Sequence, residues 1–234
     1  MTPRLELRNV AKSFTMHLRG GLRLPVVADL SFSVAPGECV VLGGPSGAGK
    51  SSILKMVFGN YAVDSGMILV ADDHTVVDVA SAGPRAVLAA RRATIGYVSQ
   101  FLRVVPRVVA RDVVAEPLIA GGVERAAAQE RASTLLRRLN LPERLWQLPP
   151  ATFSGGEQQR VNVARGFIGG RPLMLLDEPT ASLDAANRQV VIDLIGEAKA
   201  AGTSFLGIFH DEEVRDAVAD RIVDVTRFAA VQPS

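Results

Sequence analysis

Alternating apolar and polar residues mark two early segments of the chain, Leu5–Val10 and Leu30–Val34. Side chains on one face of a strand recur at every second position, so both segments predict half-buried β-strands. The pairs Gly20-Gly21 and Pro36-Gly37 are typical of turns, and they predict hairpins around these strands. We therefore expect an N-terminal antiparallel β subdomain.

From residue 38 onwards, compact apolar runs alternate with segments that have the apolar spacing of helices. An apolar run bounded by turn residues is typical of a buried strand. Strands separated by helices favour a mainly parallel sheet, and hence an α/β fold. The predicted strands are 38–42, 67–70, 95–98, 173–176 and 204–209. The predicted helices are 52–58, 126–139, 157–168, 185–200 and 211–219.

Residues 101–165 differ from the rest of the chain, because helical sequence and prolines replace the alternation of strands and helices. We expect this segment to be a helical subdomain inserted into a single domain that spans residues 1–234. The β subdomain and the core would then come from about 1–100 and 166–228, and 229–234 would be a tail.

The composition is that of an ordinary globular protein, with 48% hydrophobic and 21% charged residues. With 26 basic and 24 acidic residues among 234, the net charge of +2 gives no argument for a nucleic-acid partner. The single cysteine, Cys39, excludes an internal disulfide and indicates a core thiol in a reducing compartment. The sequence has no signal-peptide pattern and no apolar stretch approaching about 18 residues, so we expect a cytoplasmic protein without a membrane span.

Residues 44–51 fit the phosphate-binding pattern G-x-x-x-x-G-K-[ST], the P-loop, without a mismatch. They follow a predicted strand and open a predicted helix, the context in which backbone N–H groups cradle phosphate. Lys50 would reach the β- and γ-phosphates, and the Ser51 hydroxyl would bind Mg²⁺. The pattern predicts a nucleoside triphosphate site made of Gly44, Pro45, Ser46, Gly47, Ala48, Gly49, Lys50, Ser51 and Ser52.

Two carboxylates, Asp177 and Glu178, follow the apolar strand predicted at 173–176. The carboxyl edge of a parallel strand is where such sheets place ligands, so both would lie beside the P-loop. There Asp177 would hold Mg²⁺ through its water shell, and Glu178 would polarise an attacking water as general base. Two surface acids at a strand end are the structural alternative, which the P-loop upstream makes the weaker interpretation.

Ser154 and Glu157 have the spacing of a helix capping box. Between them, Gly155 and Gly156 would each weaken a helix start by about 1 kcal/mol relative to alanine. A bare backbone at a helix N-terminus is an anion site, so we favour a phosphate contact over capping alone.

The P-loop, Ser154–Glu157 and the strand ending in Asp177 and Glu178, in this order, resemble the ATP-binding cassette family over nearly the whole chain. The resemblance implies a P-loop ATPase core of RecA type that uses ATP and Mg²⁺. It also implies two chains packed head to tail, as a homodimer or as a heterodimer with a sister cassette. Each P-loop would then face Ser154, Gly155, Gly156 and Glu157 of the other chain across ATP.

The same resemblance assigns roles to further single positions. Gln100 would sense Mg²⁺ and the attacking water, and His210 would contact the γ-phosphate. Asp184 would link the two sites across the interface. Phe14 would stack on adenine, with an ordinary core position as its structural alternative. Glu157 replaces the usual glutamine, but its carboxylate can still accept a hydrogen bond from a ribose hydroxyl, so we expect hydrolysis to persist.

Within the family, segments 98–107, 140–146, 160–168 and 207–215 are similar to the L subunit of the phosphonate carbon–phosphorus lyase system. This resemblance implies a role in phosphonate breakdown, in a complex with soluble lyase core subunits. Two alternatives stay open. One is the motor of an exporter of lipid, lipoprotein or peptide, and the other is a scaffold that uses ATP only to hold a dimer together. The filled hydrolytic positions argue against the scaffold.

Three arginines, Arg103, Arg107 and Arg111, recur at every fourth residue after Gln100. If Pro106 opens a helix, Arg107 and Arg111 share one of its faces. That face would be either a solvated basic surface or a docking surface for a partner.

Overall fold

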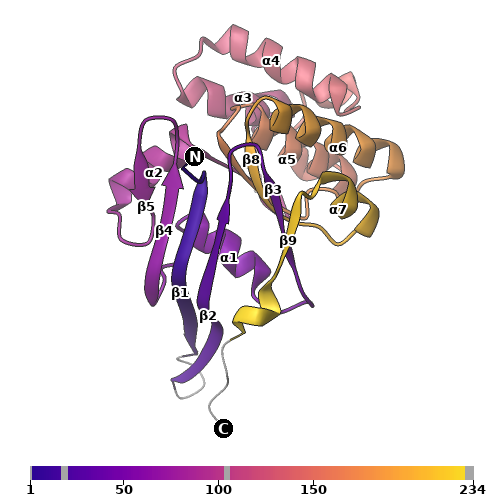
Figure 1. The fold of residues 1–234 in the computed structure, drawn as a ribbon. Coiled ribbons are helices and arrows are strands. Elements are labelled where there is room, and N and C mark those ends of the chain that lie inside the picture. The colour runs from indigo at the N-terminus through magenta and orange to yellow at the C-terminus, as the bar shows by residue number, and fades with distance from the viewer. Residues whose placement is uncertain (1, 17–20, 103–105, 230–234) are drawn as a thin grey trace.

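The computed structural model describes residues 2–16, 21–102 and 106–229, whose strands form two sheets (Figure 1). One sheet is antiparallel with the order β2-β1-β4-β5, and the other is parallel with the order β6-β7-β8-β3-β9. The antiparallel sheet comprises β1 (Leu5–Met16), β2 (Leu22–Val34), β4 (Ser65–Ala71) and β5 (Val76–Asp78). The parallel sheet comprises β3 (Cys39–Gly43), β6 (Ile95–Val98), β7 (Leu173–Asp177), β8 (Ser204–Ile208) and β9 (Arg221–Asp224). The predicted α/β fold is confirmed.

The parallel sheet is buried on both faces, which explains why its strands are continuous apolar runs. Along β7, Leu173 and Leu175 belong to one hydrophobic cluster, whereas Met174 and Leu176 belong to another. The first cluster also contains the apolar face of α1 (Lys50–Val57) and the inner face of the antiparallel sheet. Figure 1 accordingly shows α1 between the two sheets. The second cluster contains α6 (Ala185–Ala200) and α7 (Glu212–Val218), which cover the other face.

A group of three helices packs beyond the parallel sheet: α3 (Ala110–Ala120), α4 (Arg125–Arg138) and α5 (Gly155–Phe167). Trp146 closes the link between α4 and α5, because its indole Nε1 donates to the carbonyl of Leu141 at 2.9 Å. The prediction that Pro106 opens a helix is wrong. The helix α3 begins at Ala110, and Arg107 lies in the preceding turn with a φ of 66°. Arg107 and Arg111 therefore share no helical face, and Arg103 lies outside the described residues.

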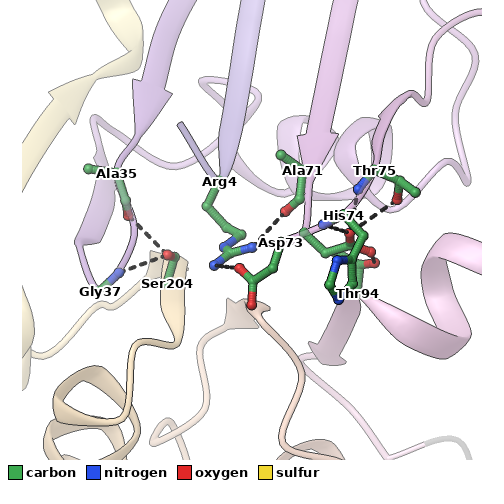
Figure 2. A network of polar contacts seen from close by, with 10 residues as sticks. Arg4, Ala35, Gly37, Ala71, Asp73, His74, Thr75, Thr94 and Ser204 are labelled. Atoms are coloured by element: carbon green, nitrogen blue, oxygen red, sulfur yellow. Dashed lines mark hydrogen bonds and ion pairs between the residues drawn. The ribbon is translucent and has the colours of Figure 1, made fainter. Parts of the chain in front are cut away.

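Hydrogen bonds join the two sheets where the parallel strands begin (Figure 2). At the start of β8, the Ser204 hydroxyl donates to the carbonyl of Ala35 at 2.9 Å and accepts from the N–H of Gly37 at 3.0 Å. Next to β4, Asp72 Oδ2 accepts from the Thr94 hydroxyl, directly before β6, at 3.1 Å. These contacts close the amino edge of the parallel sheet, and the carboxyl edge carries the predicted site.

Asp72 accepts several hydrogen bonds at this edge. Its Oδ1 accepts from the backbone N–H groups of His74 at 2.9 Å and Thr75 at 2.7 Å. These backbone hydrogen bonds are the main reason that the pKa of Asp72 falls to about 2. Beside it, Arg4 pairs with Asp73 at 3.1 Å and also donates to the carbonyl of Ala71. The strand β1 is thereby tied to the turn that follows β4.

Candidate nucleotide-binding and hydrolysis site

The P-loop connects β3 directly to α1, as its sequence pattern requires. Gly49 has a φ of 94°, and a Cβ there would come within 2.7 Å of Val26, so only glycine fits. The Lys50 ammonium lies over the loop and donates to the carbonyls of Gly44 at 2.6 Å and Pro45 at 2.8 Å. The helix start has no side-chain cap, and it combines the backbone N–H groups of its first turn with a lysine charge, which is a phosphate-binding arrangement.

Asp177, the last residue of β7, faces the first turn of α1. It is 3% exposed and accepts from the Ser51 hydroxyl and from the Tyr97 hydroxyl, each at 3.1 Å. Burial is the main reason that the pKa of Asp177 is raised above its usual range, with these two hydrogen bonds opposing the effect. A buried carboxylate beside a serine hydroxyl is an oxygen-donor set that fits Mg²⁺, whose positive charge would stabilise the ionised form.

The side chain of Glu178 contacts two residues that lie far from it in the sequence. Its Oε1 lies 2.8 Å from His210 Nε2, and its Oε2 accepts from Gln100 Nε2 at 3.3 Å. Its backbone has a φ of 54°, a left-handed conformation that is costly for a residue with a side chain. The Glu178 N–H donates to the carbonyl of Ile208 at 3.0 Å, which holds this conformation in place. Strain of this kind is concentrated at functional sites.

Gln159, on α5, is a member of this site that the sequence reasoning missed. Its side chain is buried, and Nε2 donates to the carbonyls of Pro179 at 2.9 Å and Glu178 at 3.3 Å. It therefore holds the strained turn after β7 from the helical side. The available signal was a glutamine in the first turns of the helix that follows the Ser154–Glu157 cap, and its burial appears only in the structure.

The predicted capping box at the start of α5 is present. Glu157 Oε2 accepts from both the N–H and the hydroxyl of Ser154, each at 2.8 Å. The backbone hydrogen bond from Ser154 is the main reason that the pKa of Glu157 is lowered. Gly156 also has a structural reason to be glycine, since a Cβ there would approach the carbonyl of Ser182 to 2.8 Å. The start of α5 therefore has both a capping box and two glycines whose backbone is not covered by side chains of their own.

Two other predicted site residues, Asp184 and Phe14, lie apart from the contacts described above. Asp184 caps α6, because its Oδ1 accepts from the N–H of Asn187 at 2.8 Å. Phe14 is partly buried on β1, in edge contact with the ring of Tyr61 at a centroid distance of 5.2 Å, and Lys12 Nζ lies 4.9 Å from its centroid. Among the described residues, no side-chain hydrogen bond or ion pair joins Phe14 or Asp184 to the P-loop. The roles given to both residues stay predictions.

A parallel sheet with a P-loop and two carboxylates at its carboxyl edge defines the chain as a P-loop nucleoside triphosphatase. Residues 27–181 match the sequence profile of the family described as ABC transporter. The chain belongs to that family, and it is an ATPase of the ABC type.

The relatives include the macrolide export ATP-binding/permease protein MacB of Salmonella choleraesuis (strain SC-B67), which is 33% identical over 225 residues. MacB of Escherichia coli (strain K12) is 32% identical over the same length. Each match covers 96% of this chain but 33% of the relative, so the chain spans about a third of the length of these proteins.

Solved structures agree with this fold. An ATP-binding cassette in a dimeric post-hydrolysis state, bound to ADP and Pi, superposes with a TM-score of 0.85 at 26% identity over 94% of both chains. The ATP-binding subunit of an ABC transporter superposes with a TM-score of 0.80 at 27% identity, over 96% of this chain and 87% of that one. In the described parts of this chain, no helix is long and apolar enough to cross a membrane.

Proposed function

We propose that this chain is the ATP-hydrolysing motor of an exporter, working on a permease that contains the membrane-spanning part. The similarity to MacB, a fused ATP-binding/permease protein, carries this proposal, because it extends over nearly the whole chain. The association with carbon–phosphorus lyase subunits remains a prediction from segment resemblance, and the relatives described above do not support it.

The proposed reaction uses the residues that meet at the carboxyl edge of the parallel sheet. The P-loop N–H groups and Lys50 would bind the phosphates of ATP. Ser51 and Asp177 would hold Mg²⁺, which supplies charge stabilisation to the β- and γ-phosphates when bound. Glu178 would take a proton from water while the water oxygen bonds to the γ-phosphorus and the bond to the ADP oxygen breaks. A positioned base of this kind contributes about 10²–10⁴-fold in rate.

We propose further that two copies, or one copy and a sister cassette, enclose ATP between them. The Ser154–Glu157 helix start and Asp184 make no side-chain hydrogen bond or ion pair with the P-loop in the described parts of the chain. A second chain would bring such a helix start to the phosphates, as the head-to-tail arrangement implies. The dimeric state of the structurally similar cassette supports this proposal.

A basic cavity next to Gln100 is the proposed docking site for the permease. It has a volume of about 760 Å³ and lies between α2 (Pro84–Ala93), β6, the end of α3 and α5. Phe101, which lines it, is 75% exposed. The lining also includes five basic residues, Lys55, Arg91, Arg92, Arg165 and Arg171, against two carboxylates, Asp177 and Glu116, of which Glu116 pairs with Arg165 at 2.9 Å. An exposed aromatic ring beside these charges suits a short helix with acidic and apolar residues.

Capture of the partner in the ATP-bound state tests this function. Glu178→Gln protein would be purified with ATP and Mg²⁺ from cells of its source, and Lys50→Ala protein, which we expect to lose ATP binding, serves as the matched control. A multi-span membrane protein retained by Glu178→Gln and absent from Lys50→Ala would support the exporter. Recovery of soluble lyase subunits without a permease would refute it and favour the role in phosphonate breakdown.

A further inference from the structure

Asn162 is a buried amide on the face of α5 that meets the hydrolysis site. Its neighbours in the helix, Val161, Val163 and Ala164, are fully buried and apolar, and Asn162 itself is 4% exposed. A buried amide costs about 1–3 kcal/mol unless it is hydrogen-bonded. Asn162 Nδ2 donates to the carbonyl of Ser99, which satisfies the amide and fixes one particular backbone group.

That backbone group directly precedes Gln100, the residue whose amide contacts the carboxylate of Glu178 at 3.3 Å. Gln159 lies three residues before Asn162, and positions three apart share a helix face. Gln159 holds the carbonyls of Glu178 and Pro179. Two amides of one helix therefore hold the backbone on both sides of the contact between Gln100 and Glu178.

We propose that Asn162 is a positioning residue for ATP hydrolysis, which fixes the Ser99 carbonyl and thereby directs the Gln100 side chain. The same helix begins at Ser154 and Gly155, so a displacement of its N-terminus would be passed to Gln100 through this hydrogen bond. The proposal rests on the role proposed for Gln100 and Glu178, and it adds a residue that touches neither ATP nor water.

A double-mutant cycle between Asn162 and Gln100 tests the proposal. The variants are Asn162→Ala, Gln100→Ala and the double variant, each assayed for kcat and for KM toward ATP. We expect Asn162→Ala to lower kcat roughly three- to tenfold, the size of one hydrogen bond, with KM unchanged because the P-loop is not touched. In the Gln100→Ala background the same change should have no further effect on kcat, since the groups act in series.

A buried serine in the neighbouring helix provides the control. Ser133 on α4 donates to the carbonyl of Gln129 in its own helix at 2.9 Å, away from Gln100. Ser133→Ala should leave kcat unchanged in both backgrounds, and thermal unfolding checks that each variant is folded. Asn162→Ser, a second and smaller polar variant, should fall between Asn162→Ala and the parent if the donor matters.

Four results would overturn the proposal. An equal loss of kcat from Asn162→Ala with and without Gln100 overturns the proposal, as does a loss confined to KM. A loss from Gln100→Ala but none from Asn162→Ala also overturns it, yet leaves the proposed reaction intact. If Gln100→Ala itself has no effect, the role of Gln100 fails and the positioning proposal fails with it.

Discussion

Replacement of Glu157 by glutamine should tighten ATP-driven dimerisation. Glu157 Oε2 accepts from the hydroxyl of Ser154 at 2.8 Å, and both residues belong to the helix start proposed to meet the phosphates bound to the other chain. A carboxylate at this position competes with phosphate for the hydroxyl, and it also repels the phosphate charge. Glutamine has the same shape, keeps an acceptor for the Ser154 N–H and removes the charge.

The substitution has two effects, one on the stability of the fold and one on the association of the two chains. Loss of a charge-assisted cap at the first turn of α5 should cost about 0.5–1 kcal/mol of helix stability. Two unit charges at roughly 5 Å repel by about 0.8 kcal/mol in bulk water and about 3 kcal/mol at an effective dielectric constant of 20. The cap loss lowers the stability of the fold in both the monomer and the dimer, so relief of the repulsion by about 0.8–3 kcal/mol predicts dimerisation about 4- to 150-fold tighter at each ATP site.

Sedimentation of the ATP-bound protein measures this difference. The variant is compared in a Glu178→Gln background, in which ATP should persist, and Glu157→Asp serves as the charged control. The advantage of Glu157→Gln over Glu157→Asp should shrink as salt rises from about 0.05 to 0.5 M, because added ions screen the repulsion. Equal or weaker dimerisation of Glu157→Gln at low salt would refute the electrostatic reasoning.

Three further predictions concern the base, the adenine contact and the closed sheet edge. Glu178→Gln should lower kcat by about 10²–10⁴ while ATP binding is retained, as phosphate release and nucleotide binding will show; unchanged turnover would exclude Glu178 as the base. Phe14→Ala should weaken ATP binding by about 1–3 kcal/mol in equilibrium titration, and unchanged affinity would return Phe14 to the core interpretation. Asp72→Asn should destabilise the fold by about 1 kcal/mol at pH 7, because hydrogen bonding lowers the pKa of Asp72 from its usual value of 3.8 to about 2. That stability is present above about pH 4 and is lost as the pH falls towards 2, so thermal unfolding of variant and parent should converge there, and a constant difference would contradict this assignment.

The parts of the site that the sequence could predict are those with local signals. The P-loop needs only its own glycines, Lys50, and the strand and helix on either side, all within one short segment. The cap at Ser154 is also local, because the groups that satisfy it lie three residues apart. Asp177 and Glu178 could be placed because strand ends in parallel sheets share an edge.

The missed parts depend on contacts between distant segments. The donor roles of Gln159 and Asn162 appear only when α5 packs against the turn after β7 and the end of β6. The strand β9 was missed because it is a four-residue edge strand with exposed Arg221 and Ile222, too short for an alternating pattern. The bounds of α3 were not predicted within the helical segment, because Pro117 lies inside this helix and proline ordinarily ends one.

The geometry around Glu178 indicates which of its two side-chain contacts is the weaker. An ionised carboxylate offers about four acceptor positions, so bonds from His210 and Gln100 leave room for a water. The 3.3 Å contact from Gln100 is longer than the 2.8 Å contact from His210, and it is therefore the weaker of the two. Gln100 is also linked to α5, because Asn162 on that helix donates to the carbonyl of Ser99, the residue before Gln100. The start of α5 is the segment that we propose to meet the ATP bound to the other chain. A shift of α5 would then alter the contact of Gln100 with the base first, which couples assembly of the dimer to the readiness of Glu178 for hydrolysis.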